Sequence, residues 1–358
     1  MKTVIIINEV CSDNIGDHAI NEGLTELARI TGYEAKSYGF DAEKKTVKPN
    51  IKKEKLTPKV FLRRAKNFLF NRIQILKYLR WYLHNRKRIK ETSQSDAALM
   101  MIGGGQLIQS GGTFPIAMYT WAKYAKASKK PYVILGVGCA EKFSYIDKLL
   151  YKYALGKADG VYVREKRSID KLKTFFDITP DYIPDLAFAL YGKKESVEKN
   201  SVIVGATAYY VYLKNVKELQ QTDFKSQEEY ISDWREVVEK EIKESENRIV
   251  LISTTVEDAE LNKLIYREVM KKNPGANVEI CEAVPPLPVY LNYLNASHKV
   301  YSGRMHSLIL GKILGNELEP WLISKKIEYF MDEYGSRSVA DINNELVDVF
   351  SKIIKRFN

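Results

Sequence analysis

The sequence has little of what a disulfide-stapled or membrane-spanning protein needs. Its three cysteines, Cys11, Cys139 and Cys281, are odd in number and far apart, which favours free thiols in a reducing compartment over a disulfide framework or a zinc site. No segment approaches the roughly 18 consecutive apolar residues of a membrane span. The apolar run in MKTVIIINEV is too short for a signal peptide. We therefore expect a cytoplasmic protein, and peripheral contact with the inner face of the plasma membrane stays open.

The acidic residues are dispersed along the chain, so we expect no metal ion. What the sequence does have is length and apolar content. It has 358 residues, of which 45% are apolar and 28% charged. This is enough for two domains, each with a sizeable core.

The positive charge of the chain is concentrated in one segment. The net charge is +11, but the window from Lys44 to Lys90 holds 17 Lys or Arg against one acid, Glu54, so the window carries +16 and the remainder about −5. Apolar residues recur in this segment at helical spacing: Phe61, Phe68, Leu69, Ile73, Leu76, Leu79 and Leu83. Such a helix either lies on an anionic membrane surface or packs its apolar face on its own domain. No nucleic-acid-binding motif accompanies it, so we expect no nucleic-acid partner.

Short apolar runs alternate with helical patterns along most of the chain. The strand-like runs are TVIIIN, YEAKSYGF, AALMMIGG, PYVILGVG, GVYVRE, VIVGATAYYV, RIVLIST, NVEICEA and KVYSG. This alternation predicts parallel sheets covered by helices on both faces. The polar stretch GKKESVEKN separates a first domain, residues 1–195 with the basic segment 44–90 inserted, from a second, residues 196–358. We expect two Rossmann-like α/β domains facing a cleft, with ligands at the carboxyl ends of the strands.

Two turns that contain glycine follow strands of the first domain. In NEVCSDNIGDHAI, Gly16 allows a sharp turn, and Asp17 is either the N-cap of the next helix or a carboxylate that takes a proton from a substrate hydroxyl. In MMIGGGQLIQSGG, consecutive glycines leave main-chain N–H groups open to a ligand, and we expect Gly104, Gly105 and Gln106 to bind substrate. This turn has neither the Gly-Lys-Ser/Thr of a Walker loop nor the spacing of a dinucleotide-binding motif.

Arginines stand at the start of two predicted helices. Arg164 in VYVREKRS ends a strand and opens a helix, where the helix dipole disfavours a cation unless an anion is near. We therefore expect Arg164 to bind an anion and Arg167 to be exposed. In VYSGRMHSLILG, Arg304 follows Gly303 at the head of a helix, and His306 lies in its first turn. A guanidinium, an imidazole and open N–H groups at one helix start can converge on a polyanion.

Two further pairs of residues have two interpretations each. Lys325 and Lys326 follow a strand-like run, and either one of them faces the cleft or both are solvated. Tyr209 and Tyr210 either stack on a sugar or pack at a strand end.

Taken together, these motifs resemble the polysaccharide pyruvyl transferase family. The resemblance extends to about Gly335 and rests on five motifs in order: GDHAI, GGGQLIQ, VREKRS, PDLAF and SGRMHSLILG. Such enzymes have two Rossmann-like domains, similar to GT-B glycosyltransferases. They transfer the enolpyruvyl unit of phosphoenolpyruvate to a sugar, which leaves a pyruvate ketal and releases phosphate. Ser110 departs from the family, in which many members have an acid at this position.

The resemblance implies a role for each matching residue. Arg164, Arg304 and Met305 would bind phosphoenolpyruvate, and Lys326 matches a family lysine better than Lys325 does. The acceptor would be a sugar of a cell-surface polysaccharide or of its polyprenyl-linked precursor.

The proton transfers would fall to two other residues. His306 would either hydrogen-bond the phosphate or act as general acid. Asp17, at the family's GD position, would receive the proton of the attacking sugar hydroxyl.

Two other functions remain open from the sequence. A GT-B glycosyltransferase with a nucleotide-sugar donor would share the fold and a basic donor site, although no convincing acid for the donor ribose is found. A non-catalytic sugar- or anion-binding protein, tethered through the basic helix, is the second alternative. The joint presence of Asp17, Arg164, Arg304 and His306 favours a catalyst.

Overall fold

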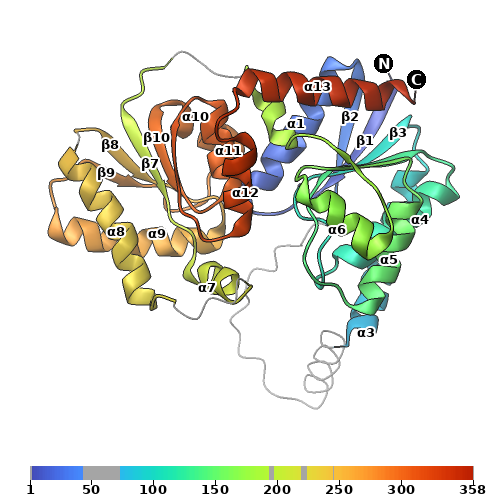
Figure 1. Cartoon of the computed structure of the whole chain (residues 1–358), viewed down its shortest axis with the longest axis horizontal. Coiled ribbons are helices and arrows are strands. Elements are labelled where there is room, and N and C mark those ends of the chain that lie inside the picture. Colours follow the sequence, from blue (N-terminus) through green and yellow to red (C-terminus); the bar gives the residue numbers. More distant parts are fainter. Residues whose placement is uncertain (1, 43–72, 193–196, 219–223, 245, 358) are drawn as a thin grey trace. The chain divides into compact units, whose positions relative to one another are not determined.

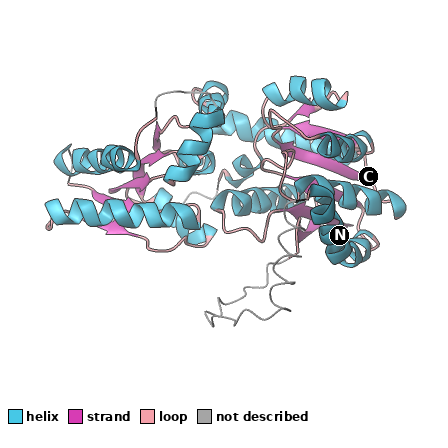
Figure 2. Cartoon of the chain, turned by 90° about the horizontal axis from the view of Figure 1, so that it is seen from below, coloured by secondary structure: helices cyan, strands magenta, loops and turns pink. Residues whose placement is uncertain are grey.

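The computed structural model describes residues 2–42, 73–192, 197–218, 224–244 and 246–357 (Figure 1). The chain divides into two compact units. The first unit is made of Met1–Cys11, Ala28–Ile183 and Ser351–Asn358, and the second of Ser12–Leu27 and Pro184–Phe350. In both units the strands lie between helices (Figure 2).

The strands described in the first unit form one parallel sheet in the order β2-β1-β3-β4-β5-β6. They are β1 (Lys2–Asn8), β2 (Tyr33–Gly39), β3 (Leu99–Gly103), β4 (Tyr132–Val137), β5 (Gly160–Val163) and β6 (Asp181–Tyr182). Strands β3 and β4 are buried at every residue, as expected for parallel strands covered on both faces.

Four helices pack on one face of this sheet: α3 (Gln74–Ser93), α4 (Phe114–Ala127), α5 (Tyr145–Gly156) and α6 (Arg167–Phe176). Their buried side chains join alternate residues of the strands in one core cluster, which includes Ile5, Ile102, Ile134, Trp121 and Tyr151. The two-residue period of a strand sends these alternate side chains to the same face.

The strands described in the second unit form a parallel sheet in the order β11-β10-β7-β8-β9. They are β7 (Ser201–Gly205), β8 (Arg248–Leu251), β9 (Val278–Ile280), β10 (Ser297–Ser302) and β11 (Glu317–Pro320). The helical elements that belong with them are η1 (Leu186–Leu190), α7 (Tyr209–Glu218), α8 (Gln227–Glu244), α9 (Val256–Lys272), α10 (Leu287–Asn295), α11 (Met305–Ile313) and α12 (Lys325–Tyr334). Tyr230, Trp234 and Ile265 of α8 and α9 pack on strands β7 and β8.

Two helices contribute residues to both units. The helix α1 (Ile15–Ile30) follows β1, yet its residues up to Leu27 belong to the second unit. The Ile15 N–H donates to the Thr254 carbonyl at 3.0 Å, and a Cβ on Gly23 would overlap the backbone of Leu186. This helix therefore approaches η1 as closely as a glycine permits. The helix α13 (Val339–Lys355) passes from the second unit to the first after Phe350.

Each of the nine strand-like runs predicted from the sequence contains a strand. The boundary predicted at residue 195 falls between η1 and β7, whereas the contacts place residues 184–192 and most of α1 with the second unit. Two details were wrong. Tyr209 and Tyr210 begin the helix α7 and do not end a strand, and the helix after β5 begins at Arg167, not at Arg164. No helix in the described part of the chain is long and apolar enough to cross a bilayer.

The described end of the basic segment is the helix α3, and its predicted apolar stripe faces outward. Three members of the stripe lie outside the described residues: Phe61, Phe68 and Leu69. Three others are 45%, 49% and 51% exposed: Ile73, Leu79 and Leu83. The helix instead buries Tyr78, Trp81 and Ile89. Leu76, the remaining member of the stripe, is half-buried. The helix therefore packs on its own domain, as one of the two interpretations expects, but chiefly through Tyr78, Trp81 and Ile89 and not through the exposed members of the stripe.

Candidate active site

The turn from β10 into α11 positions the arginine and histidine that the sequence singles out. β10 ends at Ser302, and Arg304 is the N-cap of α11 with extended backbone angles, φ −112° and ψ 119°. The Ser302 hydroxyl accepts the Arg304 N–H at 3.1 Å. A Cβ on Gly303 would lie 2.6 Å from the buried Thr207 Oγ1, so only glycine fits this turn.

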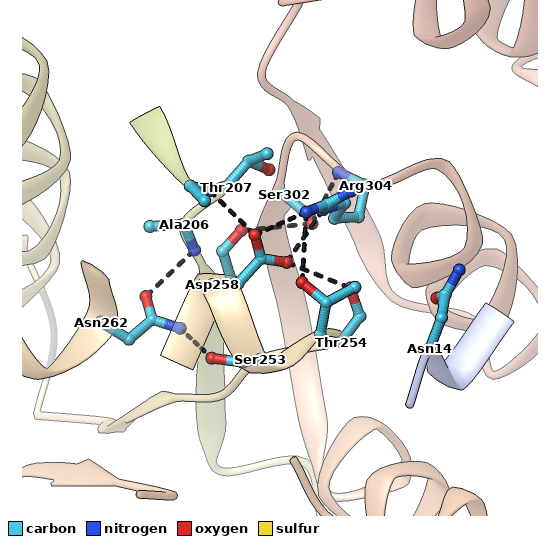
Figure 3. Close-up of polar contacts among 12 residues, drawn as sticks. Asn14, Ala206, Thr207, Ser253, Thr254, Asp258, Asn262, Ser302 and Arg304 are labelled. Carbon is cyan, nitrogen blue, oxygen red and sulfur yellow. Dashed lines mark hydrogen bonds and ion pairs between the residues drawn. The ribbon is translucent and has the colours of Figure 1, made fainter. Parts of the chain in front are cut away.

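Arg304 is held by the carboxylate of Asp258 in the first turn of α9 (Figure 3). Its Nε donates to Asp258 Oδ2 at 2.9 Å, and its Nη2 donates to Oδ1 at 2.7 Å and to Thr255 Oγ1 at 3.2 Å. The Arg304 side chain is 25% exposed and that of Asp258 only 1%. Its Nη1 makes no hydrogen bond to any residue that the structure describes. The bidentate pair thus fixes the direction of the guanidinium, and Nη1 can donate a hydrogen bond to a ligand.

The side chain of Asp258 is itself held by two hydrogen bonds, one from the backbone after β7 and one from a threonine after β8. Its Oδ1 accepts the Ala208 N–H at 2.8 Å, and its Oδ2 accepts Thr254 Oγ1 at 3.4 Å. Tyr210 shares this environment: burial and the carboxylate of Glu257 raise the pKa of the Tyr210 phenol, whereas Arg304 acts in the opposite direction. Tyr210 is 56% exposed, so its ring is available at the edge of the site.

His306 packs against α1 and η1. Its Nε2 lies 3.6 Å from Asp185 Oδ2, with the two side chains 13% and 3% exposed. Asp185 Oδ1 also accepts the Ala187 N–H at 3.0 Å and so caps η1. A Cβ on Gly16 would overlap the imidazole at Nδ1. The orientation of the ring is therefore set by a carboxylate on one side and by a glycine on the other.

Asp17 does not cap α1, so the N-cap interpretation is wrong. The cap is Asn14, whose Oδ1 accepts the Gly16 N–H at 3.0 Å. Asp17 lies in the first turn, half-buried, and its Oδ2 accepts the hydroxyl of Ser12 at 2.6 Å. Its role as proton acceptor for a sugar hydroxyl stays a prediction.

The glycine-rich turn of the first unit has the backbone that its sequence indicates. Gly104 and Gly105 have positive φ, 85° and 63°, which favours glycine. The N–H of Gly104 is not open to a ligand as we expected, because it donates to the Leu135 carbonyl at 2.8 Å. Gln106 Oε1 is buried and makes no hydrogen bond to any described residue. A buried oxygen of this kind is a candidate to accept a hydrogen bond from a ligand. A flip of the side-chain amide would place the nitrogen there as a donor instead.

Arg164 directly follows β5, in the same unit as the glycine-rich turn. Its N–H donates to the Val137 carbonyl at 3.3 Å, and its side chain is 4% exposed, with Nε 3.6 Å from Glu165 Oε1. Since β3, β4 and β5 are neighbours in the sheet, the glycine-rich turn and Arg164 belong to one edge of the first unit. Arg167 is exposed, as predicted.

The remaining predicted residues have simpler environments. Met305 is half-buried as the first residue of α11, and Lys325 and Lys326 are both exposed in the first turn of α12. Tyr209 packs on Tyr212 and Tyr230 at centroid distances of 5.9 and 5.7 Å, which is the packing interpretation of that residue.

Two carboxylates of this site were missed by the sequence analysis. Asp185 lies in the motif PDLAF, which was used only as a mark of resemblance, and Asp258 lies in TTVEDAE, which received no role. The sequence does contain a signal for Asp258: like Asp17, it is an acid in the first turn of a helix that follows a strand.

A pocket of about 850 Å³ lies beside this site in the second unit. Residues of α1 and of α10 line it, among them His18, Glu22, Leu287 and Leu291. Of the described residues, neither Arg304 nor His306 lines it. The described residues also contain no group of three or more His, Cys, Asp or Glu side chains placed to hold a metal ion.

Two parallel-sheet α/β units, with charged residues at the carboxyl ends of the strands, define a fold of the GT-B type. The polysaccharide pyruvyl transferase family matches residues 14–315, so the chain belongs to that family. No curated protein matches the chain.

Solved structures with this fold are similar over nearly the whole chain. A UDP-GlcNAc 2-epimerase from Methanocaldococcus jannaschii has 9% identity and a TM-score of 0.53, with 99% of each chain covered. A putative UDP-N-acetylglucosamine 2-epimerase from Listeria monocytogenes has 11% identity and a TM-score of 0.53, covering 98% of this chain and 91% of its own. The enzyme from Neisseria meningitidis bound to UDP-GlcNAc has 10% identity and a TM-score of 0.51, covering 100% and 99%. At these identities the likeness shows the fold alone.

Proposed function

We propose that the protein transfers the enolpyruvyl unit of phosphoenolpyruvate to a sugar of a cell-surface polysaccharide or its polyprenyl-linked precursor, acting at the cytoplasmic face of the membrane. The observation that carries this proposal is Arg304, which Asp258 holds at the start of α11 two residues before His306. Family membership supports a polysaccharide-modifying transferase.

Arginines suit the donor because phosphoenolpyruvate carries about three negative charges on a phosphate and a carboxylate. In the second unit, Arg304 offers Nη1, and Met305 and Lys326 are the other donor contacts that we propose. In the first unit, the candidates are Arg164 and the turn Gly104–Gln106. Gln106 supports this assignment because its amide has a buried oxygen without a described partner. No cofactor is required, since the leaving phosphate drives the transfer.

The reaction needs three proton transfers, and it forms two C–O bonds to C2 while the C2–O bond to phosphate breaks. The first sugar hydroxyl attacks C2 of the enol while a proton is added to C3, which becomes the methyl group. The second hydroxyl then displaces phosphate from C2 and gives its proton to the departing phosphate, and the ketal closes. We assign the C3 proton to His306, oriented by Asp185, and the hydroxyl proton to Asp17. In this assignment Asp185 is a positioning residue.

The acceptor sugar is expected to meet Tyr210. Its ring is exposed and shares the electrostatic environment of Arg304, and an aromatic face of this kind can pack on the apolar face of a sugar ring.

The test is calorimetric titration of the purified chain with phosphoenolpyruvate, and separately with uridine and guanosine diphosphate sugars. Saturable binding of phosphoenolpyruvate is expected, weakened by about 10- to 100-fold in Arg304→Ala, since a hydrogen bond to a charged group contributes about 1.5–3 kcal/mol. The matched control is Arg267→Ala, an exposed arginine of α9 in the same unit. Binding of a nucleotide sugar without phosphoenolpyruvate binding would reassign the protein to the glycosyltransferases.

A further inference from the structure

The helix α3 has two unlike apolar sides. One side is buried in the core through Tyr78, Trp81 and Ile89. The other side carries Ile75, Leu79 and Leu83 at four-residue spacing, with exposed fractions of 62%, 49% and 51%. The helix is already attached to its unit by the first side, so the second row does not serve that packing.

The exposed row is surrounded by positive charge. Arg86 and Lys90 continue the same row, because they follow Leu83 by three and seven residues. Arg80 and Lys87 are exposed beside it, and Glu91 is the acid in α3. Exposed apolar side chains beside Lys and Arg suit an anionic membrane surface, because buried apolar area and attraction to anionic lipid both strengthen binding.

The helix α5 adds a second exposed row in the same layer of helices. Tyr145, Leu149 and Tyr153 recur at four-residue spacing and are 76%, 52% and 37% exposed. The starts of α3 and α5 are adjacent, since Gln74 Nε2 donates to Asp147 Oδ1 at 2.8 Å. Both helices also pack into one core cluster on the same face of the sheet (Figure 1). We call these two rows with their basic neighbours the α3–α5 surface.

We propose that the α3–α5 surface docks on an anionic lipid bilayer, with leucine and tyrosine side chains entering the interface and Lys and Arg meeting the headgroups. The charge argument is direct, because each basic residue near an anionic leaflet contributes about 1 kcal/mol. The apolar rows favour a bilayer over a nucleic acid as the partner. The phosphates of a nucleic acid would attract Lys and Arg, but they offer no apolar environment for the three exposed isoleucine and leucine side chains of α3. This inference does not depend on the catalytic proposal, because none of its residues belongs to the proposed site.

The experiment is co-sedimentation of the full chain with phosphatidylcholine vesicles that contain or lack phosphatidylglycerol. We expect binding to the anionic vesicles, and at least about a 10-fold loss in Arg86→Glu/Lys90→Glu. The control Lys243→Glu/Lys271→Glu makes the same charge change on exposed lysines of α8 and α9 and should retain binding. Leu79→Ser/Leu83→Ser should also weaken binding, whereas Leu264→Ser on α9, at a side chain 39% exposed, should not.

Three results would overturn the proposal. They are the absence of binding to anionic vesicles, equal binding to neutral and anionic vesicles, and anionic binding that survives charge reversal on α3. Circular dichroism of each variant separates lost binding from lost folding. Phosphoenolpyruvate titration of the same variants should match the unaltered chain, so failure of this inference and failure of the proposed function are distinguishable.

Discussion

Gly16 of α1 lies against the imidazole of His306, and a Cβ at position 16 would overlap Nδ1. The ring therefore owes its place to the absence of a side chain on a helix that follows a strand of the first sheet. The glycine of the motif GDHAI thus has a place at the candidate site, in addition to the role predicted for its aspartate.

Gly16→Ala should displace His306 with little loss of global stability. Alanine is favoured over glycine in a helix by about 1 kcal/mol, which offsets part of the cost of moving the ring. We expect a fall of at least about 10-fold in kcat, since misplacement by about 1 Å can cost about 100-fold. Gly156→Ala is the control, because a Cβ there would meet only Ile178, at 4.0 Å, within the limit of contact. Unchanged turnover in Gly16→Ala would mean that the position of His306 does not matter.

Asp185→Asn should separate positioning from binding. Asparagine keeps an oxygen for the Ala187 N–H but replaces the carboxylate that faces His306 Nε2. By analogy with other histidine–carboxylate pairs, where the amide favours the wrong tautomer, kcat should fall by about 10- to 100-fold, with the KM for phosphoenolpyruvate changed less than about 3-fold. Steady-state kinetics over a range of pH provide the measurement. A loss confined to KM would contradict the positioning role.

Asp258→Asn tests whether the pair with Arg304 helps or hinders donor binding. The carboxylate neutralises the guanidinium but also fixes its direction through two hydrogen bonds. We expect fixation to dominate, so the affinity for phosphoenolpyruvate should fall by about 10-fold or more, since hydrogen bonds to charged groups contribute about 1.5–3 kcal/mol. Titration calorimetry on the folded variant measures this. Tighter binding would instead identify Asp258 as a competitor of the donor.

The fold was predictable because buried parallel strands are continuous apolar runs, such as LMMIG in β3 and YVILGV in β4. The strands β6, with two residues, and β11, with the sequence ELEP, have no such run. Their place in the sheets depends on neighbours that no local pattern contains.

The backbone of the candidate site was predictable where its conformation favours glycine, as at Gly104 and Gly105. The site was not predictable where a partner comes from a distant part of the chain, as Asp258 does for Arg304. Asn14 is an intermediate case: asparagine is a favoured N-cap residue, but the helix start that decides between Asn14 and Asp17 is seen only in the structure.

Asp147 should be a major contributor to the stability of the first unit. This fully buried carboxylate accepts hydrogen bonds from Gln74, Tyr78, Ser110 and Gly111. It thereby ties α3 and the glycine-rich turn to α5, and together with burial it raises the pKa of the Tyr78 phenol. Asp147→Ala leaves several buried donors unpaired, so the free energy of unfolding should fall by about 3 kcal/mol. Urea unfolding measures this, and the exposed Asp170→Ala in α6 should change it by less than about 1 kcal/mol.

Two of the cysteines, Cys11 and Cys139, should differ sharply in reactivity. Burial raises the pKa of the Cys139 thiol to about 12, whereas Cys11 is exposed. Because the thiolate is the nucleophile, iodoacetamide at pH 8 should alkylate Cys11 first and Cys139 only after unfolding. Since the pKa of the folded thiol exceeds the unfolded value of 9.0, its contribution to stability is complete below about pH 9 and is lost as the pH rises toward 12. Peptide mass spectrometry over a time course checks the order, and alkylation of Cys139 at the rate of Cys11 in the folded chain would show that β4 and its following turn are open to solvent.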